Sequence, residues 1–331
     1  MSDRCLGIML TTVVVISLSV VAAVQGQTSA AGEWTSPRTS WGVPDFQGVW
    51  DYQSTTPLER PSELSDKAVF TDDEAAELEQ NSLQRNSVDR RDGGAQADLN
   101  RAYGEIWYIR NPVRNTRTSL IVDPPDGRIP PLTPEAEQKR AIRSEYTRTH
   151  ADSPDSWTDL ATYARCLSRV MPRLPQGYNS GTLIVQTPGW VVLRYEQLDT
   201  RIIPVSDHPH VNKNILQWNG DSRGHWEGDT LVVDTTNFTD KQEFRTEGMF
   251  AAGVQKGALH LVERFTRVDP TTINYEATLT DPTTWTKPWT FLLPWQKDDN
   301  YVVFEYACHE RNYAMTNILR GARNQEKASE K

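Results

Sequence analysis

The chain has 331 residues, 24% of them charged, and its formal net charge is −9 with a sequence pI near 5.3. An acidic balance of this size argues against a nucleic-acid partner, because binding to phosphate needs a basic face. The length suits one large domain, and the absence of a P-loop, a GxGxxG pattern and a GxSxG motif lowers the expectation of nucleotide or serine-hydrolase chemistry.

The N-terminus has the pattern of an export signal. Arg4 forms a short basic region, Leu6 to Val24 is an apolar run, and short residues lead to Gly26. We therefore expect a signal peptide over residues 1–26, cleavage after Gly26, and a secreted or periplasmic protein without a membrane partner. The run is also long enough to cross a bilayer, so an uncleaved anchor is the alternative.

Residues 27–170 are predicted to form an N-terminal strand and a helical elaboration. The strand is centred on Gly48-Val49-Trp50. A helix should start after Thr71, since Thr71 and Glu74 form a capping box before an apolar run. The other expected elements are a loop over residues 80–100, a strand over 117–122, a turn over 123–127, a helix from the Thr133 cap to about His150, and a brief helix over 160–167.

Two cysteines remain in the mature chain, Cys166 and Cys308. In an oxidising compartment such a pair predicts one disulfide, which would tie the middle of the chain to its end. Two buried free thiols are the alternative.

Residues 171–323 are predicted to form the core of an antiparallel β-barrel and a C-terminal helix. From about residue 181 apolar residues recur at every second position, most clearly from Ile273 to Leu279. Short connections rich in Asp, Pro and Gly are typical of a meander that closes into a barrel or folds into a sandwich. The expected strands are 182–187, 190–196, 201–205, 222–226, 230–236, 259–268, 272–280, 289–296 and 301–307, followed by a helix over 313–323 and a disordered tail over 324–331.

Two resemblances bear on the fold. Segments 220–238, 117–127 and 306–310 resemble a family of exported bacterial proteins, and this likeness covers nearly the whole mature chain without implying an activity. Phe46-Gln47-Gly48-Val49-Trp50 before a meander is similar to the opening strand of lipocalin-like barrels, in which the Trp closes the base. The resemblance implies a mainly β, lipocalin-like antiparallel β-barrel with an N-terminal helical elaboration. The long helical insertion departs from a plain lipocalin and argues against simple ligand transport.

The segment of residues 220–230 is the leading site candidate. It is predicted to form two strands joined at Glu227-Gly228-Asp229. The first strand carries more polar side chains than a strand that only fills a core would need. A histidine beside a carboxylate suits a general base, although charges on one face of a strand often point only to water. The predicted catalytic residues are His225, His309, Asp221, Glu227 and Glu310.

Cationic, amide and aromatic groups near these strands are expected to hold the substrate. Arg223 would grip an anionic group through a bidentate contact, although structural pairing with a carboxylate is the commoner role. The predicted substrate-binding residues are Arg223, Trp226, Tyr178, Asn179, Glu196 and Trp218.

His208 and His210 suggest a metal site as an alternative. They would project to the same face of an extended segment, and a third ligand from His225 or His309 would complete a three-histidine site for a divalent metal. Pro209 makes the segment a loop and no metal-binding spacing such as HExxH is present, so we expect loop histidines and no cofactor.

These patterns predict an exported, cofactor-independent acid–base enzyme, a lyase, isomerase or hydrolase, whose partner is a small, partly apolar or aromatic metabolite. A non-catalytic protein that binds a small ligand is the first alternative. Deep burial of Trp and Tyr without any contact between histidine and carboxylate would favour it. A histidine-ligated metalloenzyme is the second alternative.

Overall fold

The computed structural model describes residues 34–86, 93–94, 116–149, 154–169, 171–175, 179–239 and 258–329. The chain divides into two units, Met1–Trp34 and Thr35–Lys331, and the fold is that of the second unit. The predicted signal peptide and most of the predicted loop over residues 80–100 lie outside the described residues. Within the described ranges, no helix has the length and apolar character needed to cross a membrane.

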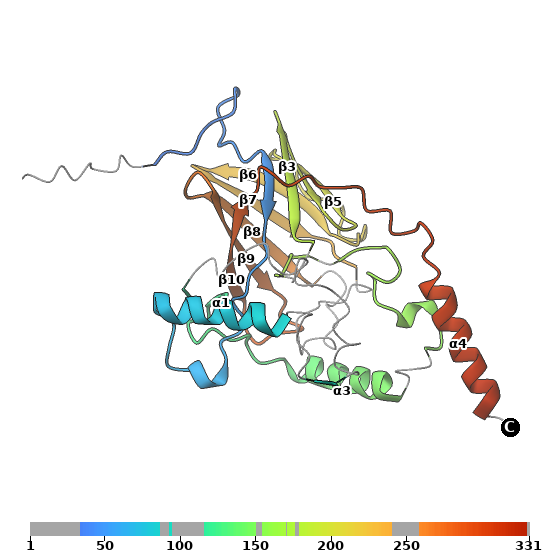
Figure 1. The fold of residues 1–331 in the computed structure, drawn as a ribbon. Coiled ribbons are helices and arrows are strands. Elements are labelled where there is room, and N and C mark those ends of the chain that lie inside the picture. Colours follow the sequence, from blue (N-terminus) through green and yellow to red (C-terminus); the bar gives the residue numbers. More distant parts are fainter. Residues whose placement is uncertain are drawn as a thin grey trace, which may run out of the picture. The chain divides into compact units, whose positions relative to one another are not determined.

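The described part of the chain is mainly β, and its antiparallel strands curl into a nearly closed barrel (Figure 1). Around the barrel the strands follow the order of the sequence. They are β1 (Gly48–Asp51), β3 (Gly181–Thr187), β4 (Trp190–Tyr195), β5 (Thr200–Pro204), β6 (Asp221–Glu227), β7 (Thr230–Thr236), β8 (His260–Arg267), β9 (Thr272–Thr280) and β10 (Trp289–Lys297). A short strand, β2 (Ile121–Asp123), pairs with β10 outside this path. The N-terminal strand β1 closes the ring between β3 and β10.

One seam of the barrel is parallel because the ring holds nine strands. Antiparallel neighbours alternate in direction, so an odd number of strands leaves one pair that runs the same way. That pair is β5 and β6, which meet at a parallel bridge between Val205 and Gly224. Ser206 N also donates to Gly224 O (3.1 Å). The other neighbouring strands of the barrel are joined by ladders of paired residues, whereas β5 and β6 share only this isolated bridge. An open groove lies along this seam.

Aromatic side chains fill the barrel interior. The alternation predicted for β9 is confirmed, since Ile273, Tyr275, Ala277 and Leu279 are buried and the residues between them are not. The Tyr275 ring lies 5.1 Å from Trp295 and 5.8 Å from Phe291, measured between centroids. Phe265 stacks on Tyr275 at 4.9 Å. The interior formed by the described residues is therefore a packed core.

The two predicted helix starts are confirmed at α1 (Asp72–Asn86) and α3 (Pro134–Thr149). Thr71 Oγ1 accepts the backbone N–H of Glu74 (3.3 Å), and Glu74 Oε2 accepts that of Thr71 (2.8 Å), which is the expected capping box. Thr133 Oγ1 accepts a backbone N–H from the first turn of α3 (3.2 Å). Thr133 also donates to two carbonyls of the β9–β10 connection, which anchors α3 at that end of the barrel.

The segment over residues 301–307 is not the strand that its alternation predicts. Because β1 already pairs with β10 and with β3, the described strands leave no edge there for another partner. Side chains hold the segment instead. Tyr301 Oη donates to Glu196, and the hydroxyls of Tyr306 and Tyr163 lie 2.9 Å apart.

Other predicted boundaries also shift. The brief helix expected over residues 160–167 is a run of turns, and Cys166 has a φ of 56°, which ends helical geometry. The strand expected over residues 117–122 shrinks to β2. The last helix, α4 (Ala314–Ser329), continues beyond Arg323 through most of the segment expected to be a disordered tail.

The predicted disulfide joins Cys166 to Cys308 across 142 residues. It fastens the segment after β10 to the turns that precede Leu167. Leu167 itself lies beside residues of β5 and β6 at their seam.

Candidate functional site

An open groove of about 620 Å³ runs along the seam between β5 and β6. Residues 200–202 of β5 and residues 221–223 of β6 form its two sides, and residues 216–220 and Leu167 border it. Three sequence candidates therefore come together here: Asp221, Arg223 and Trp218. The groove is the larger of the two pockets described in this part of the chain.

A buried ion pair lies beneath the groove. Arg201 reaches from β5 through the barrel, and its two terminal nitrogens lie 2.9 and 2.6 Å from the carboxylate of Glu263 on β8. Arg201 Nη2 also donates to Ser222 (2.9 Å) and Thr235 (3.2 Å), so the pair links β5 to β6, β7 and β8 across the seam. Tyr275 Oη donates to Glu263 Oε1 (2.8 Å).

These contacts set the ionisation of the groups beneath the groove. Burial is the largest single influence on the pKa of Arg201 and lowers it, but the charge of Glu263 together with the hydrogen bonds to Glu263 and Tyr195 outweighs burial and holds the pKa above its ordinary value. Burial raises the pKa of Tyr195 and raises that of Tyr275 well above the ordinary value for a phenol. The floor of the groove therefore carries one fixed ion pair and neutral phenols.

Asp221 is the acidic residue of the groove, and donors hold both of its oxygens. Oδ1 accepts from Arg223 Nη1 (2.8 Å). Oδ2 lies 2.9 Å from His210 Nδ1 and accepts from the backbone N–H of Val211 (3.1 Å). Asp221, a predicted catalytic residue, therefore has His210 as its histidine neighbour, which the sequence pattern suggests only as a metal ligand.

A chain of alternating carboxylates and imidazoles leads away from Asp221 over the outer face of the barrel. His210 Nε2 lies 2.8 Å from Asp234 Oδ1, and His260 Nε2 lies 2.6 Å from Asp234 Oδ2. The exposed fraction of the side chain rises along this chain, from 8% at Asp221 to 26% at His210, 35% at Asp234 and 44% at His260. The chain thus connects a shielded carboxylate in the groove to a histidine in water.

The pleat and register of β6, β7 and β8 position the chain. Asp234 pairs with Arg223 on one side and with Val262 on the other, so His260 is the diagonal neighbour of Asp234 on the same face. The loop after β5 folds over this face. Asn237 holds it there by donating from Nδ2 to two loop carbonyls at 3.0 Å, and Arg223 Nε donates to Pro209 O (3.2 Å).

The remaining residues of the predicted hairpin site lie apart from the groove. His225 Nε2 is 3.1 Å from Glu227 Oε1, so the expected contact between histidine and carboxylate exists there too. The hydrogen bond with His225, assisted by Arg264, holds the pKa of Glu227 below its ordinary value. This pair is about half exposed. Trp226 points the other way and packs against Phe46, with 5.4 Å between the centroids of the two tilted rings.

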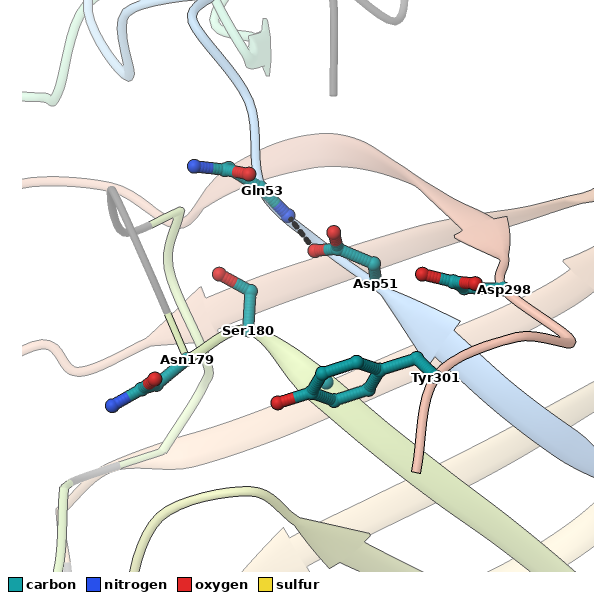
Figure 2. A pocket seen from close by; sticks show the side chains of 7 residues that line it. Asp51, Gln53, Asn179, Ser180, Asp298 and Tyr301 are labelled. Atoms are coloured by element: carbon teal, nitrogen blue, oxygen red, sulfur yellow. Dashed lines mark hydrogen bonds between the residues drawn. The ribbon is translucent and has the colours of Figure 1, made fainter. Parts of the chain in front are cut away.

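Asn179 lines a second, smaller pocket, and Glu196 contacts two of the residues that line it. Figure 2 shows Asn179 and Ser180 beside Tyr301, with the Asp51 and Asp298 carboxylates on the other side. The pocket holds about 10 Å³, room for about one water molecule. Glu196 does not line it but supports it, since Glu196 Oε2 accepts from Gly181 N (3.0 Å) and Oε1 accepts from Tyr301. Tyr178 lies outside the described residues.

The other candidates do not join a described site. His309 and Glu310 are exposed in the turn before α4, where Glu310 lies 3.8 Å from Arg311. His208 is exposed in the loop after β5. In the ranges that the structure describes, no group of three or more His, Cys, Asp or Glu side chains is arranged to hold a metal ion.

Asp234 and His260 are members of the site that sequence reasoning missed. The signal that would have found them is the alternation within β7 and β8, which places both on the outer face. Their contact also requires the register of the two strands, which the sequence does not reveal.

Searches of protein-family models, of curated proteins and of solved structures gave no match to this chain.

Proposed function

We propose that the protein is an acid–base enzyme, of the lyase, isomerase or hydrolase type, that binds a small, partly apolar metabolite in the β5–β6 groove. Asp221 would exchange a proton with the substrate. One observation carries the proposal: Asp221 lines the groove and is also the first member of the chain through His210 and Asp234 to His260.

The proposal gives a role to each residue of the hydrogen-bonded series that runs from Asp221 through His210 and Asp234 to His260. A carboxylate that takes a proton from a substrate must pass it on before the next turnover. An imidazole with one nitrogen at each of two carboxylates can accept a proton at one nitrogen and release one from the other. His210 has this placement between Asp221 and Asp234. Asp234 would then pass the proton to His260, which is the most exposed of these residues, while Arg223 fixes the orientation of the Asp221 carboxylate.

The contacts favour an enzyme over a binding protein without catalysis. Trp and Tyr side chains are deeply buried, as a binding barrel would also require, but they pack against one another in the interior. The described residues also hold several contacts between histidine and carboxylate, and one chain of them reaches the groove. The disulfide and the apolar N-terminal run together support export to an oxidising compartment.

Turnover in heavy water tests the proposal. The mature chain is incubated in D2O with a panel of glycosides, esters, hydroxy acids and ketoses, and proton NMR follows hydrolysis, elimination, isomerisation and C–H exchange. We expect the protein to transform at least one class, and Asp221→Asn to lower kcat by about 10²–10⁴-fold. His225→Gln is the matched control, because it breaks an exposed pair on the same face that does not touch the groove.

Three outcomes would contradict the proposal. Equal turnover by Asp221→Asn and the parent would remove Asp221 from the chemistry. Loss of turnover in His225→Gln but not in Asp221→Asn would move the site to the His225–Glu227 pair. If no class is transformed, the groove is a binding site and the protein is not an acid–base enzyme of these types.

A further inference from the structure

We propose that the groove recognises a neutral carbohydrate, held by stacking of one sugar ring on Trp218 and by hydrogen bonds to its hydroxyls. This inference deepens the proposed function and rests on it, since it names the substrate class for the same groove. It follows from the charge of the lining, from the apolar side chains on it and from the polar groups that the fold leaves available.

The charges of the groove cancel within the protein. Arg201 is matched by Glu263 at 2.6 Å, and Arg223 is matched by Asp221 at 2.8 Å. An anionic ligand would therefore have to compete with a carboxylate for each of the two cations that line the groove. A cationic ligand would face the opposite difficulty at Asp221. A neutral ligand meets neither cost.

An aromatic ring and aliphatic side chains give the groove an apolar surface. The Trp218 ring is held by Arg165, whose guanidinium carbon lies 5.8 Å from the ring centroid. The same Arg165 lies 5.3 Å from Trp157, which is not part of the groove. Ile202, on β5, also lines the groove and is 62% exposed. A sugar ring has an apolar face of C–H groups that suits such a surface.

Neutral polar groups stand beside this apolar surface. Thr200 and Gln217 line the groove, and their side chains have no hydrogen-bond partner among the described residues. Asn219, in contrast, is used to fix the wall, because it accepts from Ser168 (2.7 Å) and donates to Asp199 (2.8 Å). An apolar platform flanked by neutral donors and acceptors matches a ring that carries hydroxyls around its edge.

The groove also has the openness that a sugar chain requires. It lies on the outside of the barrel along a seam, and the barrel interior is filled by packed aromatic side chains. A compact aromatic metabolite would gain most from an enclosed apolar cavity. An open groove leaves the sugar hydroxyls that point outward in water, where they need no partner.

Direct binding measurements test the inference. Cellobiose, maltose and lactose serve as neutral probes, digalacturonate as an acidic probe and benzoate as an aromatic probe. Binding is followed by saturation-transfer NMR and by titration of tryptophan fluorescence with the full mature chain. We expect a neutral disaccharide to bind more tightly than digalacturonate or benzoate. Trp218→Ala should weaken that binding about tenfold, and Trp218→Phe should weaken it less because it keeps a flat face.

Trp157→Ala is the matched control, since it removes the other ring against Arg165 outside the groove and should bind as the parent does. Unfolding midpoints of all variants show whether each is folded. The inference is overturned if no neutral disaccharide binds at millimolar concentration, if digalacturonate or benzoate binds more tightly, or if a folded Trp218→Ala variant binds as well as the parent.

The two proposals fail in different ways. If neutral disaccharides bind through Trp218 but none of the panel is turned over, the sugar inference stands and the enzymatic function does not. If turnover of another metabolite class depends on Asp221 and the disaccharides do not bind, the enzymatic function stands and a neutral carbohydrate is not the substrate.

Discussion

Replacing Glu263 with leucine tests the ion pair that crosses the barrel beneath the groove. Both side chains of the pair are almost fully buried, at 3% exposure for Arg201 and 0% for Glu263. The substitution leaves a buried guanidinium without its counter-charge and removes the acceptor of the Tyr275 hydroxyl. Breaking a buried pair and orphaning a hydroxyl together should lower the free energy of unfolding by about 5 kcal/mol.

Replacing both partners should restore most of that loss. In Arg201→Met/Glu263→Leu neither charge of this pair remains, and such exchanges are often neutral for stability. Urea unfolding followed by tryptophan fluorescence measures each variant, and an unchanged m-value shows that the midpoints report stability. Glu227→Gln is the control, because it weakens an exposed pair with Arg264 and should leave the midpoint nearly unchanged.

A loss below about 1 kcal/mol in Glu263→Leu would refute the reasoning, because an uncompensated buried charge costs several times that amount. A double variant that is less stable than Glu263→Leu would also refute the reasoning, because removal of the uncompensated Arg201 charge would then have lowered stability instead of restoring it.

Three further predictions concern stability. Cys166→Ser/Cys308→Ser should lower the free energy of unfolding by about 5 kcal/mol, because the disulfide closes a loop of 142 residues. An unchanged midpoint of urea unfolding at matched pH would contradict this. Burial raises the pKa of Tyr52 to about 12. Its contribution of about 2.7 kcal/mol to the free energy of unfolding is therefore complete below pH 10 and is lost as the pH rises to about 12. Tyr52→Phe should flatten this alkaline decline in stability, measured by unfolding over that pH range. Gly220→Ala should lower the free energy of unfolding by about 2–4 kcal/mol, because φ is +69° and a Cβ would lie 2.6 Å from Thr235 Cγ2. Gly228→Ala, at φ +60° with open space around the Cβ, should lower it by only about 1 kcal/mol. Equal thermal shifts for the two variants would show that crowding at Gly220 is absent.

Much of the fold could be predicted from the sequence because the signals are local. Alternation marks strands such as β9, where every second residue enters the core. Caps mark the starts of α1 and α3, where Thr71 and Thr133 supply an oxygen to an unpaired N–H. The same local signals misread residues 301–307, because alternation records which residues are apolar and not whether a strand edge is free.

The candidate site could be predicted only in part because it depends on long-range pairing. Asp221 and Arg223 lie on one strand, and the sequence identifies both. His210 reaches them from a loop, Asp234 comes from the next strand, and His260 is a diagonal neighbour whose place depends on the register of β8. Closeness in sequence and a shared face of β6 both favour His225 as the partner of Asp221. In the structure, however, His225 pairs with Glu227.

Chemical rescue of His260→Ala tests the central claim most directly, because it separates proton transfer from substrate binding. His260 is the solvent end of the chain and 44% exposed, so added imidazole can occupy the space that the substitution leaves. With any substrate that the parent turns over, we expect His260→Ala to be slowed and imidazole to restore kcat in proportion to its concentration while KM stays unchanged. Full activity of His260→Ala without imidazole would contradict the claim that protons leave the groove through this chain.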